Sequence, residues 1–225
     1  MTTHHIDRPA DLDTVRDSYD RVADNYAHMV VTTGVGDIRC HPWLKASVDA
    51  FADTVCGVGP VLDVGCGPGT VTAYLAERGL DVSGVDLSPG MIENARRLHP
   101  QCRFDVASAT ELDLAEGSLG GILGWWSLFN LPREVLPQVL THFARALKPG
   151  GHFITATHMG DEDAVRTEAY GGVPVHWTTH KWQPAQLVPL IERAGLRPVA
   201  ELRIPADGQS GPGLVVMAEK KESPS

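Results

Sequence analysis

Short apolar runs alternate with stretches of helical character from about residue 60 onward. The apolar runs predict a strand that begins at Val61 and further strands at residues 81–85, 102–106, 120–125, 152–157, 197–204 and 214–218. The stretches between them predict helices at residues 70–78, 89–98, 133–147 and 183–194. This alternation is typical of an α/β domain with a mostly parallel sheet.

Three of these helices carry signals at their ends or inside them. Ser88 is placed to act as the N-cap of helix 89–98. The residues KPGG, at 148–151, should end the helix before them, since a cation is followed by helix breakers. Pro189 should remove one hydrogen bond from the last helix and bend it.

Two regions lie outside this alternation. Residues 1–59 contain predicted helices at 11–28 and 42–55 around a glycine-containing loop at 31–42, and they are too few to form a domain. We interpret residues 1–59 as a helical cap over the binding site of a domain that spans 60–225. Residues 158–182 are predicted to be irregular, and a connection of that length is often a lid.

A glycine-rich turn follows the first predicted strand. In VLDVGCGPG, at residues 61–69, the glycines follow the pattern G-x-G-x-G, which lets backbone approach a ligand closely because glycine has no Cβ. The helix that follows points its free N–H groups at the same place. The next strand ends on Asp86, near the roughly 20-residue offset at which an acid meets a ribose in doubly wound folds. A dinucleotide-binding turn would place its third glycine where Thr70 stands.

The segment VLDVGCGPG resembles the first motif of class I S-adenosylmethionine (SAM) methyltransferases, and VSGVDLS, at residues 82–88, resembles their second. The resemblance implies a Rossmann-like, doubly wound sheet of seven strands, mostly parallel with an antiparallel last strand. It implies SAM as the cofactor, S-adenosylhomocysteine (SAH) as its product, and Asp86 as the residue that binds the two ribose hydroxyls. The first motif supplies further expected cofactor-binding residues, namely Asp63, Gly65, Cys66, Gly67 and Gly69.

The adenine contacts expected from this family are altered here. Its members often carry an acid and a small residue after the third strand, where this chain has Ser108 and Ala109. A serine can accept a hydrogen bond from the adenine amino group, but without a charge. Leu87 and Met91 are placed to pack against the adenine ring, with ordinary core packing as the alternative.

Three other segments resemble a group of small bacterial methyltransferases, namely SYDRVADNYAHM at 18–29, LGGILGWWSLFNLP at 119–132 and FITATHMGDE at 153–162. In that group tyrosines of the first helix close over SAM, which implies this role for Tyr19 and Tyr26. They lie seven residues apart on one helix face, so packing of that helix onto the domain is the alternative. Trp125 and Ser127 follow a central strand and are expected at the same site.

The charge of the chain argues against a nucleic-acid substrate. The formal net charge is −9, and no basic stripe is visible. The Asn/Asp-Pro-Pro-aromatic motif common in enzymes that methylate base amines is absent after the fourth strand, where the chain reads SLFNLP. We therefore expect a small-molecule acceptor and no nucleic-acid partner.

Composition also bears on location. No apolar run approaches the length of a membrane span, and the N-terminus is polar. The four cysteines are scattered, without a C-x-x-C pair. We expect a cytoplasmic protein with no membrane partner and no metal site.

Methyl transfer to oxygen, nitrogen or carbon often needs a general base, and histidine is the usual candidate near neutral pH. His158 directly follows the fifth predicted strand and is our first choice, whereas His176 in the lid-like stretch is the second. Asp161 and Glu162 are alternatives. The H-x-x-x-H spacing of His176 and His180 does not by itself indicate a metal site.

Three functions remain open at this point. The first is a SAM-dependent methyltransferase that acts on a small metabolite. The second is a SAM-binding protein of the same fold with different chemistry, because fold alone does not fix function. The third, a nicotinamide-dependent oxidoreductase, is disfavoured by the glycine spacing.

Overall fold

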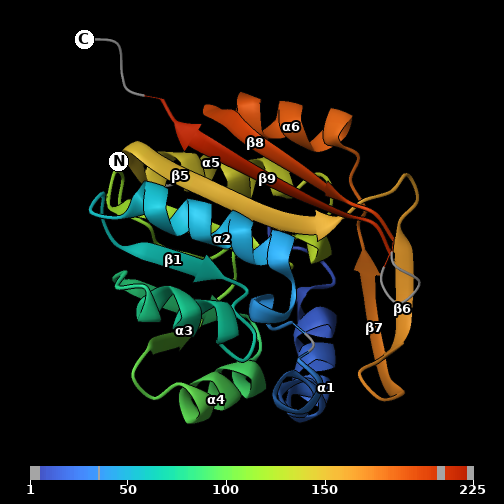
Figure 1. Cartoon of the computed structure of the whole chain (residues 1–225). Coiled ribbons are helices and arrows are strands. Elements are labelled where there is room, and N and C mark those ends of the chain that lie inside the picture. Colours follow the sequence, from blue (N-terminus) through green and yellow to red (C-terminus); the bar gives the residue numbers. More distant parts are fainter. Residues whose placement is uncertain (1–5, 35, 207–210, 222–225) are drawn as a thin grey trace.

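The computed structural model describes residues 6–34, 36–206 and 211–221. Residues 1–5 of the expected cap and 222–225 of the expected domain therefore lie outside the described residues. A seven-stranded sheet forms the centre of the molecule, in the order β3-β2-β1-β4-β5-β9-β8 (Figure 1). Its strands are β1 Val61–Val64, β2 Val82–Asp86, β3 Arg103–Val106, β4 Leu119–Trp125, β5 Leu147–His158, β8 Leu196–Ile204 and β9 Gly213–Lys220.

The first five strands of this sheet are parallel, and the chain reverses its strand order beside β1. Strand β1 pairs with β2 on one side and β4 on the other, so the carboxyl ends of these strands open a crevice at the point of reversal. The last strand, β9, runs antiparallel to both β5 and β8. The predicted mostly parallel, seven-stranded sheet with an antiparallel last strand is confirmed.

Helices cover both faces of the sheet, because its strands are apolar on both sides. On one face Phe51 of α2 and Leu75 of α3 pack with Leu123 of β4 in one buried cluster. On the other face α5 and α6 pack against the sheet, with Phe143 and Phe153 at the centre of the largest buried cluster. The helices are α1 Leu12–Thr33, α2 Pro42–Val55, α3 Thr70–Glu77, α4 Pro89–Leu98, α5 Leu136–Ala146 and α6 Pro184–Arg193.

Residues 158–182 are not irregular, so the predicted local structure of this lid-like region is wrong. The region contains an antiparallel hairpin, formed by β6 Ala164–Ala169 and β7 Val173–Thr179. The adjacent glycines 171 and 172 both have positive φ, at 95° and 78°, and form the turn. Val175 and Trp177 alternate with exposed residues on β7 and bury one face of the hairpin.

The hairpin and α1 form one unit, which we call the cover. Val15 and Val22 of α1 pack with Val175 and Trp177 of β7, although more than 100 residues separate the two segments in the chain. Of the two helices expected in the cap, α1 lies in the cover, whereas α2 packs against the sheet. In Figure 1 the hairpin and α1 lie side by side, at the edge where the parallel strands end.

Several element ends differ from the predicted ones. Helix α5 begins at Leu136 instead of residue 133, because Pro137 has no N–H for a bond to residue 133 and is tolerated only in the first turn. Strand β5 begins at Leu147 instead of residue 152. Its pairing with β4 shifts register between Leu147 and His152, so the KPGG segment lies within the strand as an irregularity. Helix α1 continues to Thr33 and ends at Gly34, whose φ is 73°.

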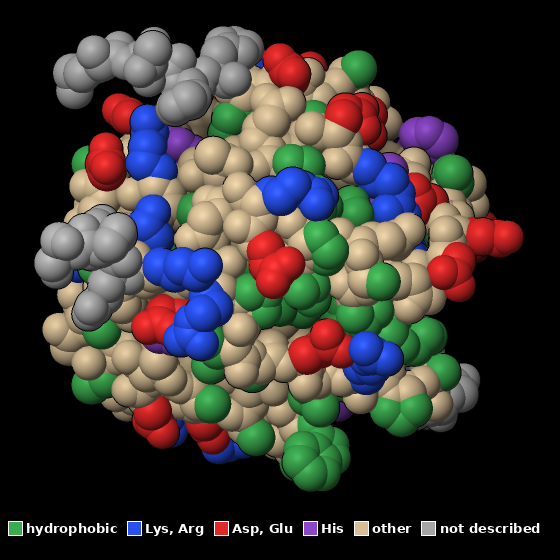
Figure 2. Space-filling model, turned by 90° about the horizontal axis from the view of Figure 1, so that it is seen from above, with side chains coloured by type: hydrophobic (Ala, Val, Ile, Leu, Met, Phe, Trp, Pro, Cys, Tyr) green, Lys and Arg blue, Asp and Glu red, His purple; other side chains and the backbone are tan. Residues whose placement is uncertain are grey.

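The predicted N-cap of α4 is confirmed. The Ser88 side chain caps α4 by accepting a hydrogen bond from the Met91 N–H. Helix α6 continues through Pro189. Among the described residues, no helix combines the length and apolar character needed to cross a membrane. On the face shown in Figure 2, Lys and Arg side chains lie among Asp and Glu side chains.

Candidate active site

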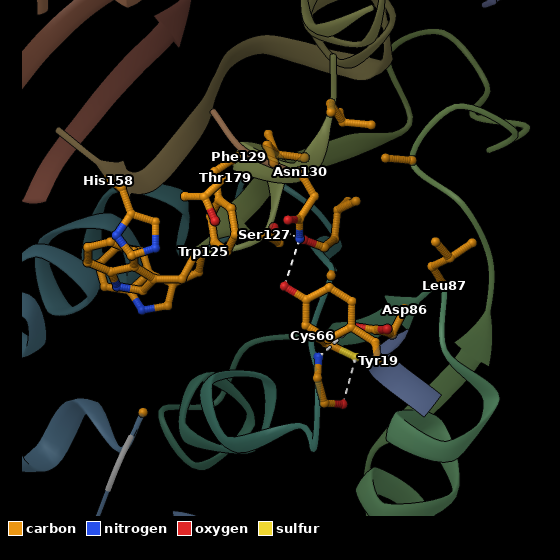
Figure 3. A pocket seen from close by; sticks show the side chains of 18 of the residues that line it. Tyr19, Cys66, Asp86, Leu87, Trp125, Ser127, Phe129, Asn130, His158 and Thr179 are labelled. Carbon is orange, nitrogen blue, oxygen red and sulfur yellow. Dashed lines mark hydrogen bonds between the residues drawn. The ribbon is translucent and has the colours of Figure 1, made fainter. Parts of the chain in front are cut away.

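A cavity of about 620 Å³ opens at the carboxyl ends of the parallel strands, beneath the cover. Its volume lies within the range of small-molecule sites, roughly 300–1,000 Å³. The predicted site residues that line it are Tyr19, Tyr26, Gly65, Cys66, Gly67, Asp86, Leu87, Met91, Ser108, Ala109, Trp125, Ser127 and His158. Figure 3 shows Asp86 and Leu87 at one end and His158 at the other, with Ser127, Asn130 and Tyr19 between them.

The glycine turn after β1 is held by backbone hydrogen bonds and by tight contacts. The N–H groups of Gly65 and Cys66 both donate to the Val85 carbonyl, at 2.7 and 3.0 Å. Gly65 has a φ of 74°, and a Cβ there would overlap the Cβ of Ser127. Gly67 has a φ of 53°, yet a Cβ there would meet only Tyr26, at an ordinary 3.6 Å. Gly65 is thus required by space and conformation, whereas Gly67 leaves open space on its ligand side.

The Asp86 carboxylate lies at the end of β2 and bridges the two predicted motifs. One oxygen accepts from the Gly67 N–H at 2.8 Å and the other from the Ser88 N–H at 2.9 Å. Burial raises the pKa of Asp86, and these two backbone bonds oppose that rise. Each carboxylate oxygen keeps a further lone pair, so the group can still accept hydrogen bonds from a pair of hydroxyls.

Asp63 and Gly69 lie behind the turn instead of on the cavity wall. One Asp63 oxygen accepts from the Thr72 hydroxyl at 2.7 Å, and the other is buried without a partner. Burial raises the pKa of Asp63 to about 7. Gly69, with a φ of 82°, lies against the ring of Phe104 and begins α3. Both residues support the turn, and the structure does not bring Gly69 to the cavity.

The ends of β2 and β3 form an apolar wall with one hydroxyl pair. Leu87 and Met91 belong to the buried cluster that joins α4 to the cover. Ser108 is buried, and its hydroxyl shares a hydrogen bond of 2.8 Å with the Thr110 hydroxyl and accepts another from the Thr110 N–H at 3.2 Å. The Ser108 hydroxyl therefore has one lone pair or one proton left for a ligand at this wall.

Aromatic side chains of the cover close the middle of the cavity. The Tyr19 ring stacks on Trp177, with centroids 4.5 Å apart, and the Tyr19 hydroxyl accepts from the Asn130 amide at 2.8 Å. Tyr26 contacts Tyr170 of the hairpin, also at 4.5 Å. The two tyrosines thus pack α1 onto the hairpin and also line the cavity, and their contact with SAM stays a prediction. The carbonyl oxygen of Asn130 is buried without a partner.

His158 lies at the opposite end of the cavity, beyond β5. Its ring contacts Trp126 and Phe129, with centroids 5.0 and 4.8 Å away. Burial, together with the charges of Arg166 and Lys181, lowers the pKa of His158 to about 4. The ring is therefore neutral at physiological pH and can accept a proton.

His176 does not reach the cavity, which corrects its place as the second base candidate. Its neighbours Val175 and Trp177 point toward α1, so the alternation of β7 turns the His176 side chain outward, where it is exposed. Only its backbone is engaged, with the Ser18 hydroxyl. Within the described ranges, no three His, Cys, Asp or Glu side chains form a group that could hold a metal ion.

Most of the aromatic and basic side chains around His158 were not predicted from sequence motifs. Trp126 and Phe129 belong to segment 119–132, which was expected near the site without a role for either residue, whereas Arg166, Tyr170 and Lys181 belong to no recognisable motif; all five line the cavity. The paired glycines 171 and 172, flanked by β-branched residues, were the signal that could have revealed the hairpin.

Comparison with known proteins supports the same fold and domain. Residues 61–151 match the family model described as "Methyltransferase domain". A demethylmenaquinone methyltransferase of Beutenbergia cavernae is 35% identical over 119 residues, which cover 51% of this chain and 46% of that protein. The chain spans about half the length of the curated relatives it matches.

Two solved structures resemble the chain over almost its whole length. One is a 1,6-didemethyltoxoflavin-N1-methyltransferase of Burkholderia thailandensis, with a TM-score of 0.70, 22% identity and coverage of 96% of this chain and 94% of that one. The other is a magnesium protoporphyrin IX methyltransferase of Synechocystis, with a TM-score of 0.71, 16% identity and coverage of 95% and 99%. Residues 61–151 therefore match a methyltransferase domain, and the chain has the fold of class I SAM-dependent methyltransferases.

Proposed function

We propose that this chain is a SAM-dependent methyltransferase that transfers a methyl group to an oxygen, nitrogen or carbon atom of a small molecule. The observation that carries the proposal is the junction of the two predicted motifs. Asp86 holds the Gly67 N–H at the mouth of the turn, and both residues line a cavity closed by tyrosines. The matched methyltransferase domain contains both motifs.

The cavity residues fit SAM. Asp86 offers two charged acceptors, which suit a pair of ribose hydroxyls. The open side of Gly67 gives room for close approach to the turn. On the cavity wall, the buried Asn130 Oδ1 lacks a partner, and an acceptor of this kind suits a positive group of the cofactor. When bound, SAM would supply the electrophilic methyl group.

The chain's own residues would then position the acceptor and take its proton. The cover, built from α1 and the hairpin, excludes water and fixes the orientation of the reactants, which is the main protein contribution to an in-line displacement. His158 is the proposed general base, because it is neutral and lines the cavity at the end remote from Asp86. We retain the division into an N-terminal cap and a domain over residues 60–225 as a proposal, with α1 as the capping part.

A small molecule is the acceptor that the cavity best suits. The site lies beneath the cover, and the net charge of the chain is −9, which disfavours a polyanionic partner. Names of the neighbours point the same way, since didemethyltoxoflavin and magnesium protoporphyrin IX are small molecules. All four cysteines are free, which supports our proposal of a reducing, cytoplasmic compartment.

Incubation with SAM that carries a tritiated methyl group tests this function directly. The protein is mixed with a small-molecule extract, and label in the fraction below about 1 kDa is separated from SAM by chromatography. We expect new labelled products with the wild-type chain and none with Asp86→Ala. SAM binding without transfer to any extract would favour a SAM-binding protein with other chemistry.

A further inference from the structure

The end of the cavity around His158 is built for a flat molecule. Trp126 and Phe129 follow β4, and both contact the His158 ring at tilted or edge geometry. Aromatic side chains of this kind gain most from planar ligands that stack or pack edge to face. This end of the cavity, with Trp126, Phe129 and His158 in its wall, is hereafter called the acceptor end.

Two cations also line the cavity near His158. Arg166 comes from β6 and Lys181 follows β7, so the hairpin brings both to the wall. Their positive charges both disfavour protonation of His158, which places them within electrostatic reach of its ring. Lys181 is held by its stem, which lies over Gly160.

Neither cation has an acidic partner among the described residues. Asp163 contacts the Lys181 backbone, but its carboxylate already binds Arg133 and His180, each at 2.6 Å. The contact is a hydrogen bond from the Lys181 backbone N–H, and among the described residues no ion pair joins Asp163 to the Lys181 ammonium group. Two acids line the described cavity wall. Asp11 is the N-cap of α1, and Asp86 lies beside the glycine turn at the end of the cavity opposite His158, hereafter called the cofactor end. Two like charges at one wall repel each other unless an anion lies between them.

We propose that the methyl acceptor is a planar aromatic carboxylate, with its ring against Trp126, Phe129 and His158 and its carboxylate bound by Arg166 and Lys181. This inference rests on the proposed methyltransferase function of the same cavity. The guanidinium fork of arginine matches both oxygens of a carboxylate, and lysine adds a point charge. The negative charge would also offset the two cations, which would raise the pKa of His158 toward its usual value and make it a stronger base.

Binding of two matched probes tests this assignment. Isothermal titration with 2-naphthoate and with the neutral isostere 2-naphthamide is carried out on the protein saturated with SAH. We expect 2-naphthoate to bind at least about tenfold more tightly than the amide, since only the acid makes charge-assisted hydrogen bonds to both cations.

Variants of Arg166 and Lys181 test whether these two side chains cause the preference for the acid over the amide. Arg166→Gln and Lys181→Met should each reduce the ratio of acid to amide affinity severalfold, and Lys181→Met keeps the stem over Gly160. Arg193→Gln is the matched control, because Arg193 is exposed on α6 and does not line the cavity. All three variants should bind SAH like the wild type.

Two patterns would overturn the inference while leaving the proposed function standing. One is equal affinity for the two probes, or no binding of the acid, in protein that binds SAH normally. The other is an acid preference that survives in Arg166→Gln and Lys181→Met. Failure of SAH itself to bind would count against the proposed function, and with it against this inference.

Discussion

The two ends of the cavity differ in the kind of group that forms them, mainly backbone at the cofactor end and mainly side chains at the acceptor end. At the cofactor end, backbone groups and glycines of three consecutive segments fix the geometry, as the bonds of Gly65 and Asp86 show. At the acceptor end, side chains from β4, β5 and the hairpin form the wall, and His158, Arg166 and Lys181 supply its polar groups. The first end is rigid and local in sequence, whereas the second is assembled from distant parts of the chain.

Because of this difference, proteins of this fold can keep the same cofactor-binding end while the side chains of the acceptor end vary. Backbone hydrogen bonds at strand ends depend little on side-chain identity, so they can bind one cofactor in many proteins. Side chains on a hairpin can change without disturbing the sheet, because the hairpin packs mainly on α1. We therefore expect changes at the two ends to affect different steps.

The largest effect should come from His158, at the acceptor end. His158→Ala should lower kcat by roughly 10²–10⁴ and leave SAM affinity unchanged, since a positioned base contributes about that much. The pKa of about 4 keeps the ring neutral above that pH, so the acid limb of kcat/KM should have its midpoint near pH 4 and vanish in the variant. His158→Gln, which keeps a polar side chain, is the control for shape. Full kcat in both variants would return His158 to a packing role.

A smaller effect, confined to binding, should follow from a change at the cofactor end. Asp86→Ala removes a charged acceptor for two hydroxyls, and hydrogen bonds to charged groups contribute roughly 1.5–3 kcal/mol. SAM affinity measured by titration calorimetry should therefore fall by about 100-fold, whereas 2-naphthoate affinity should change little. Unchanged SAM affinity would mean that another group holds the ribose.

Two glycines of the same turn should differ in stability. Both glycines have positive φ, but Gly65→Ala also places a Cβ onto Ser127, whereas a Cβ at Gly67 meets only an ordinary contact with Tyr26. Overpacking typically costs about 1–3 kcal/mol, so Gly65→Ala should lower the free energy of unfolding by that much more than Gly67→Ala. Urea denaturation measures both. Equal losses would show that Ser127 can move away without cost.

The smallest effect concerns motion in the ligand-free protein. Amide hydrogen exchange should be faster in β6 and β7 than in β1, β4 and β5, because a two-stranded sheet has fewer neighbours than the centre of a seven-stranded one. Addition of SAM should slow exchange in the hairpin and in α1 together. Equal protection of hairpin and central strands without ligand would contradict a cover that opens.

The sequence predicted the cofactor end better than the acceptor end, for physical reasons. The glycine turn and Asp86 form a local motif whose geometry follows from strand–turn–helix chemistry alone. His176 was misplaced because the alternation of a strand, unrecognised in a stretch expected to be irregular, turns its side chain outward. The contact of Tyr19 with Trp177 depends on how α1 meets the hairpin, and no local pattern encodes it.

Thermal melting with ligands tests the central claim most directly. A ligand that binds only the folded state stabilises it by about 2.7 kcal/mol at a hundredfold excess over its Kd. We expect millimolar SAM and SAH each to raise the Tm of the wild-type chain, with little shift in Asp86→Ala and none with NAD. The absence of any shift with SAM and SAH, or a shift with NAD instead, would contradict the claim that this cavity is a SAM site.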